Sequence, residues 1–368
     1  MRSAFTRASK RADLVICTGG LGPTVDDRTC DVLSELCNKE IIVHEPSFTQ
    51  MKEKYESRGR KLTPKSERQV RALESATTYL NPAGAAPGFS LSLNKALVIC
   101  LPGPPSELKA IFNTYLLDEI QELKRSKGEK NGILKKCTYR VFGLAESEIA
   151  TKLDHLQMPQ GVTLHYQVKF PEILIKILSN QESQTLAETS FKEAEKSVLD
   201  EIGDHVHGLN ENNLPKTLSK VLLEKSMTLS IGESCTGGLI GSLMTESPGA
   251  SKIFLGSMVT YANQEKMRQL DVSEKTLIEH GAVSRHCVEE MVEGCVKKTG
   301  SDAAIAVSGV AGPGGGTAEK PVGLVWLAAM VKGKGLVTHK ISWPGSRDRI
   351  RLLAAYSAMS LLLSLIKE

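Results

Sequence analysis

Short apolar runs that end in glycine-containing turns constrain the fold of this chain more than any other feature. They cover residues 14–17, 96–101 and 227–231 of a 368-residue sequence, and helix-like segments alternate with them. Continuous apolar strands that alternate with helices are typical of parallel sheets covered by helices on both faces. The sequence therefore predicts the α/β fold class.

Composition separates three regions, which we predict to be separate domains. Residues 1–125 and 214–366 show the strand–helix alternation, so we expect two three-layer α/β domains with mostly parallel sheets. Between them, residues 132–208 hold strands of alternating polarity and two helices, which indicate a small α+β module. A helix at residues 5–11 opens the first domain where a strand is usual, so we expect this domain to be incomplete at its start.

Charge and cysteine usage exclude several classes of function. The formal net charge is +4, with acidic and basic residues interspersed, so no electrostatic footprint for nucleic acid is present. The eight cysteines form no CxxC pair, which favours free thiols over disulfides or a zinc site. No apolar run reaches 18 residues. We expect a cytoplasmic protein with neither nucleic acid nor membrane as a partner.

The run Gly-Glu-Ser-Cys-Thr-Gly-Gly at residues 232–238 is the most informative motif. It lies between a predicted buried strand and a helical pattern, where backbone N–H groups and one hydroxyl converge. Such a turn suits an anion or a developing oxyanion. The alternative is a tight turn in which Ser234 or Thr236 caps the helix.

A second glycine-rich loop, at residues 18–27, follows the first predicted strand and opens a helix. Its glycines allow a phosphate to approach the backbone closely. Asp26 and Asp27 would repel that phosphate unless a divalent, Mg²⁺-like cation lay between them. Alternatively, both acids only complement the helix dipole. The predicted nucleotide site of this domain comprises Gly19, Gly20, Gly22, Thr24, Asn81, Gly103 and Glu107.

Taken in this order, these N-terminal motifs resemble those of the molybdopterin-binding-like domain that begins proteins of the CinA family. The resemblance implies a domain linked to ADP-ribose pyrophosphatase activity that depends on a divalent cation. Relatives carry a further strand before the position of Phe5, so it also implies that part of the nucleotide pocket is missing. Residues 139–148 resemble the entry to the KH-type domain of the same family, but no GXXG loop follows. We therefore expect a spacer or dimer element there.

Further motifs at residues 259–266, 281–284, 308–316 and 320–323 resemble the C-terminal domain of the CinA family, a nicotinamide mononucleotide amidohydrolase. The resemblance implies a dyad of Ser234 and Lys266, which lie 32 positions apart. A serine nucleophile needs a base, and a lysine can serve when burial lowers its pKa. Cys235 is the better intrinsic nucleophile, and the residues alone do not decide between it and Ser234.

The remaining candidates surround this dyad in the sequence. We expect Tyr261 to hydrogen-bond Ser234 or Lys266, or to pack beside the strand. An arginine after residue 345 is expected to grip a phosphate. The predicted substrate-binding residues are Thr236, Gly237, Gly238, Gly312, Gly314, Gly315 and Arg347.

The expected reaction is hydrolysis of nicotinamide mononucleotide to nicotinate mononucleotide and ammonia, without a cofactor. The expected partners are a small nucleotide substrate and, from the family, a second copy of the chain. Two alternatives stay open. One is a metal-dependent ADP-ribose pyrophosphatase in the N-terminal domain, and the other is a non-catalytic nucleotide- or molybdopterin-binding protein.

Overall fold

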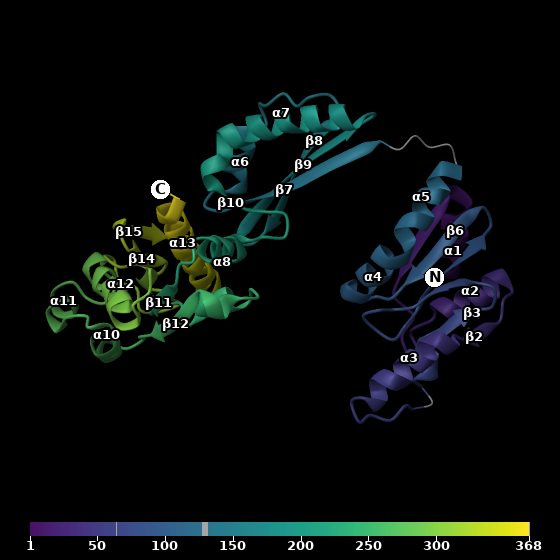
Figure 1. Cartoon of the computed structure of the whole chain (residues 1–368), viewed down its shortest axis with the longest axis horizontal. Coiled ribbons are helices and arrows are strands. Elements are labelled where there is room, and N and C mark those ends of the chain that lie inside the picture. The colour runs from purple at the N-terminus through teal and green to yellow at the C-terminus, as the bar shows by residue number, and fades with distance from the viewer. Residues whose placement is uncertain (64, 127–131, 368) are drawn as a thin grey trace. The chain divides into compact units, whose positions relative to one another are not determined.

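A computed structural model of the chain describes residues 1–63, 65–126 and 132–367. It divides into two compact units, Met1–Asn131 and Gly132–Glu368, each of which has its own apolar cores (Figure 1). We describe each unit by itself.

Unit 1 is a three-layer α/β domain. Its sheet has the strand order β1-β6-β5-β4, and β2 and β3 form a separate pair. Helices α1 and α2 pack on one face of the larger sheet, and α4 and the segment after it pack on the other. The elements are α1 Arg2–Arg11, β1 Leu14–Thr18, α2 Thr29–Cys37, β2 Ile41–Val43, α3 Glu45–Glu56, β3 Arg71–Leu73, β4 Thr77–Tyr79, β5 Gly88–Leu93, β6 Ala96–Leu101, α4 Pro105–Ile111 and α5 Leu117–Ser126.

The expectation of a mostly parallel sheet is wrong for unit 1. Strands β1 and β6 pair in parallel, but β6 with β5 and β5 with β4 pair antiparallel. The physical reason is the length of the connections. Two residues, Asn94 and Lys95, join β5 to β6, and a parallel crossover needs a dozen or more. Asn94 has a φ of 54°, which such a tight hairpin requires.

The first part of unit 2 is a small α+β module. Its sheet, in the order β10-β7-β9-β8, is antiparallel throughout. Helices α6 and α7 cover one face, where Tyr139, Ile175, Phe191 and Val198 form an apolar core (Figure 1). The elements are β7 Ile133–Val141, α6 Glu146–Leu153, β8 Val162–Lys169, β9 Glu172–Gln181, α7 Gln184–Ile202 and β10 Val206–Leu209.

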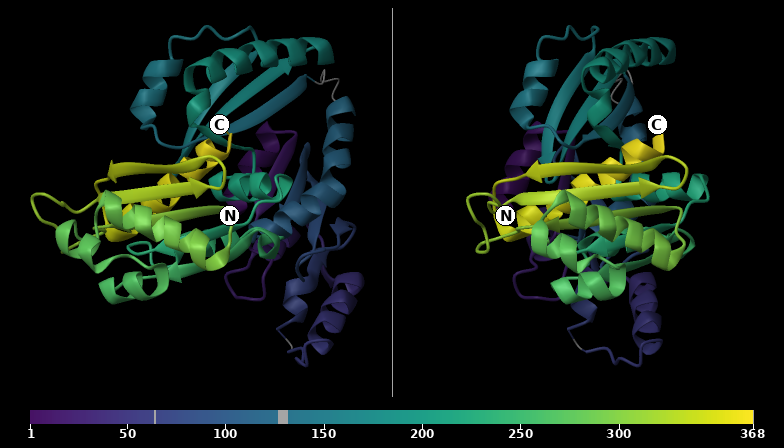
Figure 2. Two further views of the ribbon diagram at one scale, coloured as in Figure 1. Left: turned by 60° about the vertical axis from the view of Figure 1, so that its left-hand side comes forward. Right: turned by 90° about the vertical axis from the view of Figure 1, so that its left-hand side faces the viewer.

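The rest of unit 2 is the second three-layer α/β domain (Figure 2). Helices α8, α9 and α13 pack on one face of its sheet, and α10 and α12 pack on the other. The elements are α8 Leu214–Glu224, β11 Leu229–Glu233, α9 Leu239–Thr245, β12 Phe254–Val259, α10 Asn263–Leu270, α11 Glu274–Glu279, α12 Arg285–Thr299, β13 Ala303–Gly309, β14 Leu324–Val331, β15 Gly335–Ser342 and α13 Arg347–Lys367.

This sheet is mixed rather than mostly parallel. Its order is β12-β11-β13-β14-β15, and β11 pairs in parallel with both β12 and β13. Strand β14 pairs antiparallel with both β13 and β15, because a loop without a helix joins β13 to β14 and a short turn joins β14 to β15. The α/β class and the layers are as predicted.

Within the described part of the chain, α13 is the one helix whose length and composition would allow it to cross a membrane. However, 61% of its apolar window is buried within the protein. Ala354, Ala355, Met359 and Leu362 belong to the core that α13 shares with the sheet and α8. Its hydrophobicity is therefore that of a core helix.

A buried ion pair of the α+β module is hydrogen-bonded to the first residue of the second α/β domain. Arg140 on β7 donates to Glu172 on β9 across 2.8 Å, and their side chains are 5% and 3% exposed. The other carboxylate oxygen of Glu172 accepts the N–H of Leu214, the first residue of α8, across 2.9 Å. Arg140 also donates to the carbonyl of Asn210.

Replacing Glu172 with alanine should lower the free energy of unfolding of unit 2 by about 3–5 kcal/mol, because it leaves the Arg140 guanidinium buried and unpaired. Denaturant titration followed by circular dichroism measures this loss. Asp200→Ala, which removes a pair whose side chains are 80% and 63% exposed, should change stability by less than about 1 kcal/mol. Equal losses in the two variants would contradict the assignment.

Candidate active site

The turn at residues 234–238 lies at the carboxyl end of β11, the strand between β12 and β13. Leu229 and Ile231 are fully buried in the core on one face of the sheet, and Gly232 lies against Leu270, Met291 and Cys295 on the other, so β11 is covered on both faces. Gly237 and Gly238 then adopt φ angles of 59° and 92°, a left-handed conformation that glycine reaches without strain. The turn is therefore compact, and α9 begins directly after it.

Lys266 meets Ser234 in this turn. The Lys266 Nζ lies 3.0 Å from the Ser234 Oγ, and the two residues are 1% and 8% exposed. Helix α10 carries the lysine, and its side chain also donates to the carbonyls of Thr260 and Tyr261, at 2.6 and 3.4 Å. The structure thus brings together the two residues of the predicted dyad.

Burial shifts Lys266 toward its neutral form. Burial lowers the pKa of Lys266 from the usual lysine value, and no carboxylate in the described part of the chain lies within ion-pair distance of it. A neutral amine has two hydrogens and one lone pair. The two backbone carbonyls accept the hydrogens, so the lone pair can accept the Ser234 hydroxyl proton. This is the arrangement that a general base requires.

Cys235 lies in the same turn but points into the apolar core. It is 5% exposed and belongs to the cluster that contains Leu229, Ile231 and Ile240. Burial raises the pKa of the Cys235 thiol to about 11, although Lys266 opposes this. A thiol with such a pKa forms little thiolate at neutral pH, so the geometry favours Ser234 as the nucleophile.

The backbone amides of the turn are mostly occupied. A carboxylate oxygen of Glu233 accepts the N–H of Gly238 at 2.9 Å, and the Gly237 N–H donates to the Ser234 carbonyl. Contrary to expectation, these two glycines therefore offer no amide to a substrate. The amides of Cys235 and Thr236 make no hydrogen bond within the described residues. They are the donors left for an oxyanion.

Tyr261 does not contact the dyad through its hydroxyl, contrary to one expectation. Its ring is 60% exposed, and the hydroxyl accepts a hydrogen bond from Arg347 Nη2 at 2.9 Å. The backbone carbonyl of Tyr261 is the atom that accepts from Lys266. Tyr261 thus contacts Arg347 through its side chain and Lys266 through its backbone.

Arg347 and Arg351 lie one turn apart at the start of α13, so they share a helix face. Arg347 Nη1 donates to the Gly312 carbonyl at 2.7 Å, and Arg351 Nη2 donates to the Thr236 carbonyl at 2.7 Å. Both guanidinium groups keep further donors for an anion. The Thr236 hydroxyl is buried and has no partner among the described residues.

Gly312 has a φ of 75° and begins the exposed loop that follows β13. Gly314 and Gly315 lie farther along this loop. Within the described residues, no hydrogen bond joins either of them to Ser234, Lys266 or Arg347. The structure thus places Gly312 beside Arg347, while a substrate role for Gly314 and Gly315 stays a prediction.

The N-terminal candidates gather around a separate cavity of about 210 Å³ in unit 1. It is lined by Gly19, Gly20, Gly22, Gly103 and Glu107, together with Asp27. Asn81 lies behind this lining, where its amide donates to Glu107 at 2.7 Å. Thr24 does not line the cavity and is bonded to Asp27 instead.

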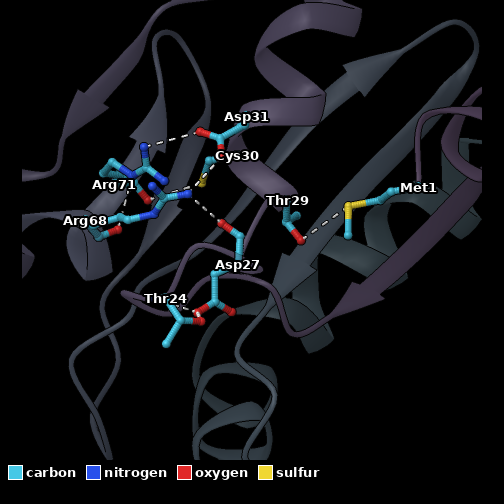
Figure 3. A network of polar contacts seen from close by, with 8 residues as sticks. All are labelled: Met1, Thr24, Asp27, Thr29, Cys30, Asp31, Arg68 and Arg71. Atoms are coloured by element: carbon cyan, nitrogen blue, oxygen red, sulfur yellow. Dashed lines mark hydrogen bonds and ion pairs between the residues drawn. The ribbon is translucent and has the colours of Figure 1, made fainter. Parts of the chain in front are cut away.

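The structure does not support the predicted cation site at Asp26 and Asp27. Helix α2 begins only at Thr29, so neither acid lies within its first turn, and Asp26 is exposed. One carboxylate oxygen of Asp27 accepts both the N–H and the hydroxyl of Thr24, which lowers the pKa of Asp27 (Figure 3). The described residues contain no group of three or more His, Cys, Asp or Glu that could hold a metal ion.

Two neighbouring arginines hold the segment around this loop in place. Arg68 donates to the carbonyl of Asp27 and to the carboxylate of Asp31, and Arg71 donates to the other oxygen of Asp31 (Figure 3). Asp27 and Asp31 thus have protein partners. They fit a structural network better than a divalent cation.

Sequence reasoning missed two contributors to the active site. Glu233 is a fully buried carboxylate next to Ser234, and its signal was a charged residue at the end of an otherwise buried strand. Arg351 was not among the predicted substrate-binding residues, although it follows the same segment as Arg347. Its four-residue spacing from Arg347 could have placed both on one helix face.

Comparison with known proteins gives matches over most of the chain. Residues 1–122 match a probable molybdopterin binding domain, residues 136–208 the KH domain of damage-inducible protein CinA, and residues 211–366 the CinA C-terminal domain. The chain is 36% identical to a CinA-like protein of Dictyoglomus turgidum, over 98% of this chain and 87% of that protein. It is 35% identical to a putative competence-damage inducible protein of Clostridium acetobutylicum, over 95% of this chain and 84% of that protein.

Solved structures match a smaller part. The competence/damage inducible protein CihA of Agrobacterium tumefaciens is 37% identical, with 41% of this chain and 94% of that chain covered and a TM-score of 0.40. A CinA superfamily protein of Escherichia coli is 34% identical, with 42% and 89% covered and a TM-score of 0.41. From the full-length relatives and the domain matches together, the chain belongs to the CinA family.

Proposed function

We propose that the second α/β domain of unit 2 hydrolyses the carboxamide of nicotinamide mononucleotide to nicotinate mononucleotide and ammonia. The observation that carries this proposal is the 3.0 Å contact between the Ser234 hydroxyl and a buried Lys266 amine that has no carboxylate partner in the described part of the chain. The substrate itself is proposed from the resemblance to the CinA C-terminal domain. We further propose that the protein acts in the cytoplasm as a homodimer.

In the first step the Ser234 oxygen bonds to the amide carbon while the hydroxyl proton passes to the Lys266 Nζ. The carbonyl oxygen becomes an oxyanion, and the amides of Cys235 and Thr236 are its proposed donors. The C–N bond then breaks, and the leaving nitrogen takes the proton from Lys266 and departs as ammonia.

In the second step a water molecule attacks the acyl ester. Lys266 takes a proton from the water, and the ester oxygen of Ser234 regains a proton as the nicotinate carboxyl leaves. The residues thus return to their starting states. This chain's own groups supply every proton transfer in the proposal.

The phosphate of the substrate is proposed to bind Arg347. This guanidinium bridges the Gly312 carbonyl and the Tyr261 hydroxyl, which fixes its plane. A guanidinium held in this way presents its remaining N–H groups to a phosphate. The amides at the start of α9 do not serve here, because Glu233 accepts from them.

The cavity of unit 1 supports a second, separate proposal. Its glycine-lined wall favours binding of a small phosphate-containing ligand such as a nucleotide or molybdopterin. Because Asp27 accepts from Thr24 and the described residues contain no group of three or more His, Cys, Asp or Glu that could hold a metal ion, the geometry favours binding over metal-dependent pyrophosphate cleavage.

Replacing Ser234 with alanine or Lys266 with methionine should lower ammonia release from nicotinamide mononucleotide by about 10³-fold or more, because each removes one member of the dyad. The assay is steady-state ammonia release by the full chain in excess chelator. Cys235→Ala removes a buried thiol and should keep most of the activity. Strong activity of Ser234→Ala would contradict the mechanism.

The rate should rise with pH. Lys266 acts as the neutral base, so kcat/KM is low where the amine is protonated and reaches its plateau above the pKa of Lys266. Burial lowers this pKa, so the half-point should lie below the 10.5 of an ordinary lysine. A profile of kcat/KM between about pH 6 and pH 10 measures this half-point. A rate that falls as the pH rises through this range would exclude a lysine base.

Replacing Arg347 with alanine should lower kcat/KM for the mononucleotide by about 10- to 100-fold, the effect of losing a charged hydrogen bond to phosphate. The riboside that lacks the phosphate should be affected much less. Arg349→Ala is the matched control, because that guanidinium lies over the Phe170 ring instead. Equal losses for both substrates would show that Arg347 does not bind the phosphate.

A further inference from the structure

We propose that Glu233 is a positioning residue that fixes Ser234 against Lys266 and closes the start of α9 to anionic ligands. The role in hydrolysis rests on the proposed function, but the geometric role concerns the reactivity of Ser234 toward any electrophile. Glu233 has no place in the proton transfers described above.

The carboxylate of Glu233 is fully buried and accepts hydrogen bonds from two elements. One oxygen accepts the N–H groups of Gly238 and Ile240, at 2.9 and 3.1 Å. The other oxygen accepts the N–H of Gly241 at 3.0 Å and the hydroxyl of Ser257, on β12, at 2.8 Å. Three of these bonds join the two ends of the Ser234 turn, and the fourth joins Glu233 to the neighbouring strand β12.

The backbone of Glu233 links the other half of the dyad to the same strand. Its carbonyl accepts the N–H of Thr260 at 2.8 Å. The carbonyl of Thr260 in turn accepts from the Lys266 Nζ at 2.6 Å. Glu233 therefore connects the turn that carries the nucleophile with the carbonyl that orients the base.

A buried carboxylate is costly unless donors surround it, so an apolar residue would be the simpler choice for packing alone. No cation in the described part of the chain lies within ion-pair distance of Glu233, and backbone donors compensate the charge instead. This arrangement specifies the direction of each N–H group in the turn. It also fills the position that an anion would otherwise take at a helix start.

A displacement of the nucleophile by about 1 Å can lower a rate by about 10²-fold. In Glu233→Gln an amide NH₂ replaces one acceptor oxygen and faces backbone N–H donors, so the turn must shift. We expect the shift to separate Ser234 from Lys266. The lysine and its surroundings stay in place.

The test measures how fast a fluorophosphonate reagent labels Ser234 in the full chain, with the labelled residue identified by mass spectrometry. Glu233→Gln should label about 100-fold more slowly than wild type, at a temperature where circular dichroism shows both folded. The pH half-point of labelling should be unchanged, because Lys266 remains the base. Glu172→Gln is the matched control, since that carboxylate is as buried and also accepts a helix-start N–H, from Leu214. It should lose stability but label at the wild-type rate.

Glu233→Ala adds a second readout that stability alone would not produce. Formate can fill the vacated carboxylate position, so it should restore labelling of this variant with saturation and leave wild type unchanged. If Glu233→Ala does not fold, Glu233→Gln decides the proposal. Labelling of Glu233→Gln within threefold of wild type would overturn it, and so would a loss that only follows a lower melting temperature.

The same experiment separates this proposal from the proposed function. Wild type that is labelled at Ser234 but releases no ammonia from the mononucleotide would contradict the substrate and leave the Glu233 comparison intact. Wild type that is not labelled at Ser234 would overturn the positioning role itself, because no reactive serine would exist to be positioned.

Discussion

The parallel pairing of β11 with both β12 and β13 is the constraint on which the candidate active site depends. Parallel strands end at the same edge of a sheet, so the turn after β11 and the segment after β12 meet there. Ser234 comes from the first and Lys266 from the second. Strand β14 runs away from this edge and β15 runs back to it. Helix α13 therefore begins there, with Arg347 and Arg351 in its first turns.

Two buried ionisable side chains at this edge, Lys266 and Glu233, have different surroundings and different roles. Lys266 is surrounded by carbonyl acceptors, and burial lowers its pKa so that the amine can act as a base. Glu233 is surrounded by N–H and hydroxyl donors, which compensate its carboxylate without a cation among the described residues. Backbone groups thus orient a base on one side of Ser234 and fix a turn on the other.

The apolar pattern predicted the α/β class and the family resemblance implied the dyad, but neither gave the details around them. Apolar runs and glycine turns are local signals, so the position of β11 and its turn followed directly. Strand direction was harder, because the two-residue connection from β5 to β6 looks like any other turn until pairing is known. The partner of the Tyr261 hydroxyl, Arg347, also lies far away in the sequence.

By itself the sequence determined which residue types could do chemistry and in which order they occur: a serine in a glycine turn, a lysine 32 positions later and arginines near the end. Only the tertiary structure decided their states. Whether Lys266 is buried without a carboxylate, whether Cys235 points into the core and whether Asp27 is free for a cation all follow from packing. A pKa and a hydrogen-bond partner are set by the surrounding atoms, and those atoms come from strands and helices that are distant in the chain.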